Sequence, residues 1–363
     1  MCTVPFFYHS SNFMEEKLFF GGVKGGKTTK IITLNGKKMR KIPSTIGNLT
    51  GLKVLNLQNN LIPSVCSELS TLTQLTVLNM GNNLLEEVPE EVKYLTSLTK
   101  LHLFGNRISR FASEICDGLK NLTLLNLNNN QLTYIPKEVS RLENLIYLSV
   151  NHNQLTSIPR ELCFLKNLCE LQLNYNQISC IPEDIWFLKS LQKLFLARNN
   201  IEVLPELLCH LINLKSLDIA GNLIQIFPSG FQYMKLKEFY CEGNPLYLKH
   251  PVGAIKKLDV LSLQEITSRF IMNQLIEMNP FLMEAMAWYP QIWQTISKGK
   301  LCAICGKSFL AMWIECVEFV PPSKNWRTSR NLKLVPLRTL ICSFACFNQR
   351  GPNQFGIAHV QNQ

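Results

Sequence analysis

A motif of the form L-x-x-L-x-L-x-x-N-x-L recurs nine times in this chain and strongly limits what the chain can fold into. The asparagine of the motif stands at positions 60, 83, 106, 130, 153, 176, 199, 222 and 244. Successive asparagines are 23 residues apart, except for one step of 24 and a last step of 22. So many copies in phase indicate one small structural unit repeated along the chain, and units of this length stack into a solenoid.

Each part of the repeat has a physical role. The alternation L-x-L predicts a short strand whose leucines point inward, and parallel stacking of these strands predicts a curved sheet. An asparagine amide both donates and accepts hydrogen bonds, so it can satisfy backbone groups where the chain turns after the strand. A proline such as Pro89 or Pro136 limits regular structure in the second half, and the apolar pair that follows predicts a short turn or 3-10 helix beneath the sheet. The longer copy carries its extra residue between Ile115 and Leu119, where we expect a local bulge.

The stretch at 21–28, GGVKGGKT, matches the phosphate-binding pattern G-x-x-x-x-G-K-[ST]. Such a loop must be followed by a helix, because the amides at the helix N-terminus bind the phosphates. Counting back 23 residues from Asn60 places the strand of a tenth repeat, with Ile32 and Leu34 as its core, directly after the motif. We therefore predict no nucleotide binding and interpret the stretch as a glycine-rich, basic lead-in to the array.

The repeats, with their I-P-x-x-[IL]-x-x-L second halves, resemble the short intracellular leucine-rich repeat class, which includes Ras-pathway scaffolds. The resemblance implies an α/β solenoid of about ten repeats with a curved parallel sheet, in an intracellular interaction protein that is not an enzyme. We expect a lead-in at 1–28, the array at 29–248, a helical C-terminal cap at 249–298, a cysteine-rich, zinc-ribbon-like module at 299–350 and a flexible tail at 351–363.

Charge and composition exclude several partners. The formal net charge is +11, but residues 52–244 carry 16 basic and 18 acidic side chains, so the excess lies at the two ends. A nucleic-acid-binding array would carry a basic stripe on its main surface. The chain also shows no secretory signal and no apolar run long enough to span a membrane. We expect a cytoplasmic protein with protein partners, no nucleic acid and no membrane span.

The x positions of L-x-x-L-x-L-x-x-N form the exposed side of the sheet, which we call the sheet face. Exposed aromatic residues there are typical anchors of protein interfaces. We predict that the partner-binding residues are Lys100, His102, Phe104, Tyr147, Glu170, Gln172, Lys193, Phe195, Asp218 and Tyr240. No catalytic set can be placed on this face, so we predict a non-catalytic scaffold or adaptor, with a role in signal transduction. The alternative is a substrate receptor of a ubiquitin ligase in which residues 245–363 dock the ligase.

Two cysteine pairs stand near the C-terminus. Cys302 and Cys305 form a C-x₂-C motif, and Cys342 and Cys346 form a C-x₃-C motif after 36 intervening residues. Four thiolates in such pairs predict one tetrahedral structural zinc, with no open position for catalysis. Cys316 and His359 are spare candidate ligands. The alternatives are inert structural thiols or a redox role.

Overall fold

The computed structural model describes residues 29–248, 261–328, 332–350 and 355–362. These residues form two compact units. The described part of the first unit comprises residues 29–223, 234–244 and 325–328, and the second comprises 224–233, 245–248, 261–324 and most of the remainder. The glycine-rich stretch at 21–28 lies outside the described residues. No helix among the described residues is long and apolar enough to cross a membrane.

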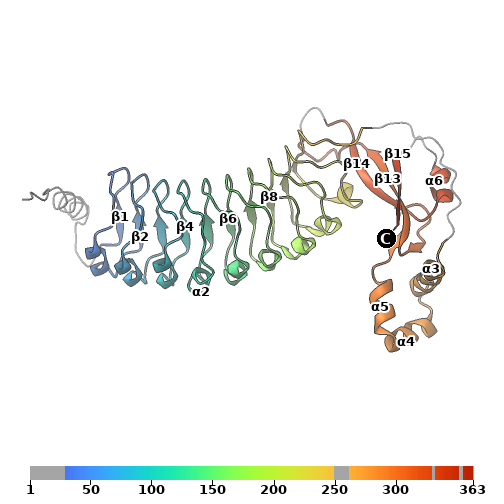
Figure 1. Ribbon diagram of the computed structural model, residues 1–363, viewed down its shortest axis with the longest axis horizontal. Coiled ribbons are helices and arrows are strands. Elements are labelled where there is room, and N and C mark those ends of the chain that lie inside the picture. The colour runs from blue at the N-terminus through green and yellow to red at the C-terminus, as the bar shows by residue number, and fades with distance from the viewer. Residues whose placement is uncertain (1–28, 249–260, 329–331, 351–354, 363) are drawn as a thin grey trace, which may run out of the picture. The chain divides into compact units, whose positions relative to one another are not determined.

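The first unit is built on one parallel sheet of ten strands, in which each strand pairs with the next one along the chain (Figure 1). Its strands are β1 (Ile31–Thr33), β2 (Val54–Asn56), β3 (Val77–Asn79), β4 (Lys100–His102), β5 (Leu124–Asn126), β6 (Tyr147–Ser149), β7 (Glu170–Gln172), β8 (Lys193–Phe195), β9 (Ser216–Asp218) and β10 (Glu238–Tyr240). The register is constant, so Leu55, Leu78 and Leu101 stand beside one another, and all three are fully buried. The predicted leucine-rich repeat solenoid, including the tenth copy that begins with β1, is confirmed.

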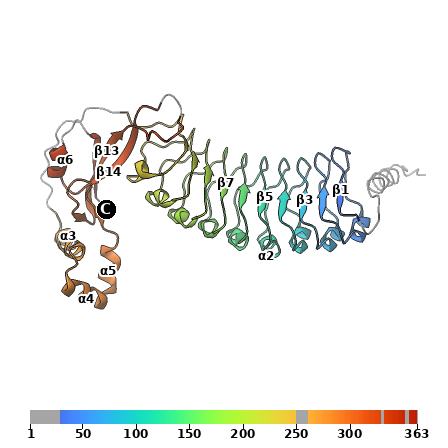
Figure 2. The same cartoon turned by 180° about the vertical axis from the view of Figure 1, so that it is seen from behind.

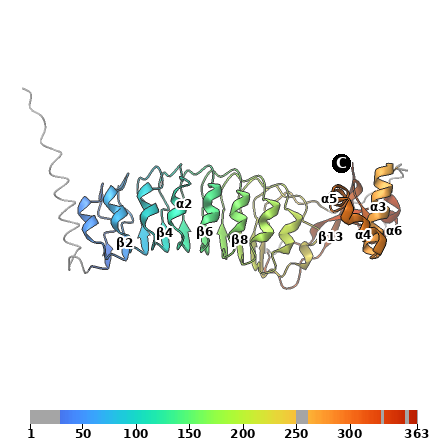
Figure 3. The same ribbon diagram turned by 90° about the horizontal axis from the view of Figure 1, so that it is seen from below.

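Short 3-10 helices form a row on the other side of the leucine core (Figure 3). In the first unit they are η2 (Ser44–Asn48), η3 (Ser67–Thr71), η4 (Glu90–Tyr94), η5 (Lys137–Arg141), η6 (Arg160–Phe164), η7 (Glu183–Phe187) and η8 (Glu206–His210). Proline precedes each of them except η3, which follows Cys66. In the longer repeat a turn of α-helix, α2 (Ile115–Gly118), takes up the extra residue.

A ladder of buried asparagines joins the repeats at the turn after each strand. Asn153 is typical: its Oδ1 accepts from the backbone N–H of Leu132 at 3.0 Å, and its Nδ2 donates to the carbonyls of Leu127 and Val150 at 3.0 and 3.3 Å. The residue before the asparagine adopts a left-handed conformation in most repeats, as His152 does with a φ of 53°. This turn aims the amide into the core, where it satisfies backbone groups of its own repeat and of the preceding one.

The last strand of the sheet is covered by a segment from far along the chain. The backbone of Arg327 pairs with β10, donating to the carbonyl of Lys237 at 2.7 Å and accepting from Phe239 N–H at 2.9 Å. The indole of the neighbouring Trp326 packs edge-on against the ring of Phe239 at 5.3 Å. This segment lies outside the cap expected at 249–298, which stays a prediction, and it closes an edge that would otherwise expose unpaired backbone groups.

The second unit combines helices with a small antiparallel sheet (Figure 2). Its helices are η9 (Phe231–Tyr233), α3 (Leu263–Ile276), α4 (Pro280–Trp288), α5 (Pro290–Ile296) and α6 (Phe344–Arg350). Its strands are the hairpin β11 (Lys300–Leu301) and β12 (Ser308–Phe309), and the sheet of β13 (Met312–Val320), β14 (Val335–Ile341) and β15 (Phe355–Asn362), in the order β14-β13-β15. Ser262 caps α3 by accepting from Glu265 N–H at 3.1 Å, as the S-x-x-E pattern of the sequence indicates.

Candidate functional site

The strands place the predicted partner-binding residues along the sheet face. Each strand carries two of its three side chains on this face, such as Lys100 and His102 on β4, while the leucine between them is buried. The aromatic residues differ in how much they offer to a partner. Tyr240 on β10 is 36% exposed, whereas Phe104, Tyr147 and Phe195 are half-buried.

Phe104 is not a free anchor, because its ring covers Gly81 of the preceding repeat. A Cβ atom built on Gly81 would lie 2.5 Å from two carbons of that ring. The missing side chain of Gly81 therefore makes room for the aromatic ring. The pattern of aromatics in the sequence did not predict this packing, although the glycine at the equivalent position one repeat earlier is a usable signal.

The middle of the sheet face is a hydrogen-bonded network of uncharged side chains. The fully buried hydroxyl group of Ser149 lies 2.6 Å from Asn128 Oδ1 and 3.0 Å from Gln172 Oε1. The Oδ1 atoms of Asn128, Asn151 and Asn174 each accept the backbone N–H of the equivalent residue one repeat later, at 2.7 Å. These asparagines stiffen the sheet face and leave it polar.

Charged groups flank this network. The ammonium of Lys193 lies 3.1 Å from a carboxylate oxygen of Glu170, and Gln172 donates to the other oxygen at 2.5 Å. Burial, together with the nearby Lys100, lowers the pKa of His102, so this side chain is neutral at physiological pH. Burial also raises the pKa of Asp218, and the charge of Glu242 adds to the rise against a hydrogen bond from Ala220 N–H.

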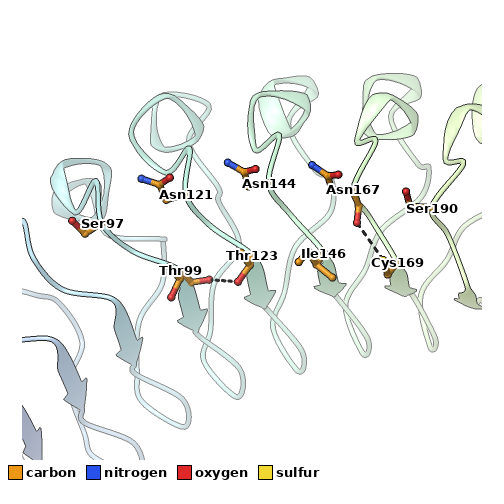
Figure 4. Close-up of a pocket in the computed structure, with 9 residues that line it drawn as sticks. All are labelled: Ser97, Thr99, Asn121, Thr123, Asn144, Ile146, Asn167, Cys169 and Ser190. Carbon is orange, nitrogen blue, oxygen red and sulfur yellow. Dashed lines mark hydrogen bonds between the residues drawn. The ribbon is translucent and has the colours of Figure 1, made fainter.

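A shallow pocket of about 730 Å³ runs along the side of the array, at the start of the strands (Figure 4). It is lined by Ser97, Thr99, Asn121, Thr123, Asn144, Ile146, Asn167, Cys169 and Ser190. Its asparagines form a second ladder, in which Asn121, Asn144 and Asn167 donate to the carbonyls of Thr96, Lys120 and Glu143 at 2.9 Å. The asparagine side chains of the pocket are thus used to join neighbouring repeats.

The four predicted cysteines come together in the second unit. Cys302 and Cys305 lie in the turn between β11 and β12, Cys342 follows β14, and Cys346 lies on α6. Their sulfur atoms all lie within 4.8 Å of one another, with Cys342 Sγ 3.6 Å from both Cys305 Sγ and Cys346 Sγ. We call this group the cysteine centre, and it could hold a metal ion.

The electrostatics of the cysteine centre favour anionic sulfur at one position. Burial raises the pKa of the Cys302 thiol, but hydrogen bonds from the backbone N–H groups of Cys305, Cys342 and Ile304 outweigh it and lower the pKa to about 7. The spare candidate Cys316 is not one of the four clustered sulfur atoms: it lies within β13 in the apolar core that also contains Cys302 and Cys346, and burial raises its pKa to about 12. The side chain of His359 lies outside the described part of the chain.

Comparison with known proteins agrees with this architecture. Family models described as leucine-rich repeats match residues 50–108, 96–155, 143–201 and 213–234. The human leucine-rich repeat-containing protein 69 is 72% identical over 347 residues, which is 96% of this chain and 100% of the human protein. The chain belongs to the leucine-rich repeat-containing protein 69 family.

Other members and solved structures extend the comparison. The mouse and Xenopus laevis members match over 130 residues, with 59% and 46% identity, covering 36% of this chain and 38% of each relative. The plant peptide hormone receptor RGFR1, solved in complex with RGF2, shares 30% identity at a TM-score of 0.53, over 59% of this chain and 36% of the receptor. The functional domain of InlJ from Listeria monocytogenes shares 28% identity at a TM-score of 0.52, over 64% of this chain and 46% of that one. The matching family models indicate a repeat protein of the interaction type and no catalytic family.

Proposed function

We propose that this protein is a non-catalytic cytoplasmic scaffold or adaptor that holds a protein partner on its sheet face and acts in signal transduction. The observation that carries the proposal is the sheet face itself. It runs unbroken over ten strands and combines a rigid polar centre with aromatic and charged side chains. RGFR1, a plant peptide hormone receptor, was solved in complex with RGF2, which supports a polypeptide ligand for an array of this kind.

In this proposal the partner-binding residues are Lys100, His102, Phe104, Tyr147, Glu170, Gln172, Lys193, Phe195, Asp218 and Tyr240. Rigid aromatic anchors surrounded by polar groups are the usual energetic centres of protein interfaces. Because Phe104 also packs on Gly81, the clean test replaces Tyr147, Phe195 and Tyr240 with alanine.

Quantitative affinity purification from cells would compare this triple variant with wild type. The matched control replaces Tyr94, Phe164 and Phe187, three exposed aromatics at the ends of 3-10 helices on the opposite side of the array. We expect proteins recovered with wild type and control to be lost in the sheet-face variant. Equal recovery with all three proteins would reject the proposed binding face.

We further propose that the cysteine centre, in a zinc-ribbon-like module, holds one structural zinc. Zinc lies about 2.3 Å from each of four tetrahedral thiolates, which places the sulfur atoms about 3.8 Å apart. The sulfur atoms here need only small shifts to reach that geometry. Zinc content measured by elemental analysis should approach one per chain and fall in Cys302→Ser but not in Cys180→Ser, an exposed solenoid cysteine. A chain free of zinc when purified from zinc-containing medium would contradict this.

One observation favours the alternative function, the ubiquitin-ligase receptor. Leu263, Ile266 and Phe270 form an exposed apolar stripe along α3, on the side away from its buried residues Glu265, Ser268 and Met272. A helix with this spacing suits a hydrophobic groove on a second protein. Replacing Leu263 and Phe270 with glutamine should abolish co-purification of cullin or elongin if this alternative holds, and recovery equal to wild type would exclude the stripe as the ligase contact.

A further inference from the structure

Three polar side chains of α3 reach the module that carries the cysteine centre. Glu265, Arg269 and Asn273 are spaced by four residues, so they lie in a row on one side of the helix. All three bind backbone atoms of segments that carry or flank the cysteines. The row therefore connects a helix to the loops whose relative positions define the centre.

Glu265 is the buried end of this row. It is 1% exposed, and its two carboxylate oxygens accept the backbone N–H groups of Leu310 and Ala311 at 3.0 and 2.6 Å. The same carboxylate accepts Arg269 Nε at 2.5 Å. A buried ion pair of this kind needs its remaining hydrogen-bonding groups satisfied, and here each carboxylate oxygen also accepts a backbone N–H.

Arg269 uses its other two nitrogens on carbonyl groups. One donates to the carbonyl of Cys342 at 3.1 Å, and the other donates to the carbonyl of Met312, the first residue of β13, at 2.7 Å. At the far end of the row, Asn273 Oδ1 accepts the backbone N–H of Ser308 on β12 at 2.8 Å. Arg269 thus touches the backbone of a cysteine of the centre, while Asn273 holds the hairpin on which Cys302 and Cys305 lie.

We propose that Arg269, oriented by Glu265, is a positioning residue of the cysteine centre. By holding the Cys342 carbonyl and the start of β13 at once, its planar guanidinium keeps the Cys342–Cys346 half of the centre in register with the Cys302–Cys305 half. This inference rests on the proposed zinc site. Groups that orient metal ligands without touching the metal commonly change metal affinity by about 10- to 100-fold when they are removed.

The test is metal binding by the full-length chain stripped of metal under reducing conditions. Zinc affinity would be measured by competition with a chromophoric chelator, and Co²⁺ would report the ligand geometry through its visible absorption. The test variant is Arg269→Lys, which keeps the charge beside Glu265 but cannot donate to two carbonyls from a rigid fork. The matched control is Arg338→Lys, which alters the ion pair between β13 and β14 in which Arg338 Nε lies 3.4 Å from Glu315.

We expect Arg269→Lys to lower zinc affinity by about 10-fold or more at an unchanged stoichiometry and to shift the Co²⁺ spectrum, with Arg338→Lys remaining within about 2-fold of wild type. A merely structural role for Arg269 would lower stability but leave the Co²⁺ spectrum unchanged. Wild-type affinity and spectrum in Arg269→Lys would overturn the inference while leaving the zinc site intact. Absence of metal binding by wild type would instead remove the zinc site itself. If Arg269→Lys does not fold, Arg269→Gln, which leaves the Glu265 carboxylate bound to the N–H groups of Leu310 and Ala311, decides by the same criteria.

Discussion

Replacing Asn153 with alanine should lower the free energy of unfolding of the array, and the hydrogen bonds of Asn153 show which groups lose their partners. The carbonyls that Asn153 contacts are shared: Leu127 O is also bound by Asn130 Nδ2, and Val150 O by Asn176 Nδ2. These carbonyls keep one partner after the substitution. The buried N–H of Leu132 does not, because Asn153 Oδ1 is its acceptor.

An orphaned buried donor costs about 1–3 kcal/mol, and each lost hydrogen bond costs about 0.5–1.5 kcal/mol more. Asn153→Ala orphans one donor and removes two further hydrogen bonds, so we expect it to lower the free energy of unfolding by about 2–6 kcal/mol. The control is Asn144→Ala, which removes one exposed hydrogen bond to the carbonyl of Lys120 and should cost less than about 1 kcal/mol.

Urea unfolding followed by circular dichroism would give the two free energies, and hydrogen exchange would report on the amide of Leu132. Its exchange should accelerate in Asn153→Ala and stay slow in Asn144→Ala. The reasoning is refuted if the two variants are equally stable, or if the Leu132 amide remains protected in Asn153→Ala.

Three further predictions concern a close approach of two repeats, the closed sheet edge and the cysteine centre. Gly118→Ala should lower the free energy of unfolding by about 1–3 kcal/mol, because a Cβ atom there would lie 1.6 Å from the carbonyl oxygen of Lys93. An unchanged midpoint of urea unfolding would contradict this. Trp326→Ala should cost about 3–5 kcal/mol through lost packing on Phe239 and should speed amide exchange in β10, whereas unaltered exchange there would show that Trp326 does not hold the edge segment. Zinc occupancy should fall as the pH is lowered, because protons compete for the thiolates: burial raises the pKa of the Cys342 and Cys346 thiols, whereas at Cys302 backbone N–H groups outweigh burial and lower the pKa to about 7. Occupancy measured by elemental analysis after dialysis at a series of pH values would check this, and constant zinc content down to about pH 5 would speak against four competing thiols.

The array could be predicted almost completely from the sequence because every repeat contains the residues that determine its own structure. The spacing of leucine and asparagine fixes the strand, the turn and the burial of each, and Asn153 or Asn176 does the same work as any other member of the ladder. Contacts between neighbouring repeats follow once one pair is known. The constant repeat spacing also predicts the strand at Ile31–Thr33, directly after a stretch that matches a phosphate-binding loop.

Features that depend on the difference between adjacent repeats were harder to predict. The ring of Phe104 rests on Gly81, and this pairing is visible only when residues 23 positions apart are read together. The second asparagine ladder, at Asn121, Asn144 and Asn167, lies outside the motif that defines the repeat. Both could be found by comparing equivalent positions along the array, because stacking makes such positions neighbours in space.

The closed edge of the sheet and the support of the cysteine centre depend on contacts between residues that are far apart in the sequence. The repeat spacing does not relate these residues to one another. Trp326 meets Phe239 across more than 80 residues, and Arg269 meets Cys342 across 73. The cysteine centre itself could be predicted, because metal-binding cysteines occur in pairs at short spacings and two such pairs together supply the four ligands of one metal ion. A helix that holds the Cys342 loop carries no comparable signal: Glu265 and Arg269, four residues apart, read equally well as an exposed ion pair on a helix surface. What separates the two readings is burial, and burial of Glu265 is decided by where the β12–β13 turn lies, which the spacing of residues in α3 does not specify.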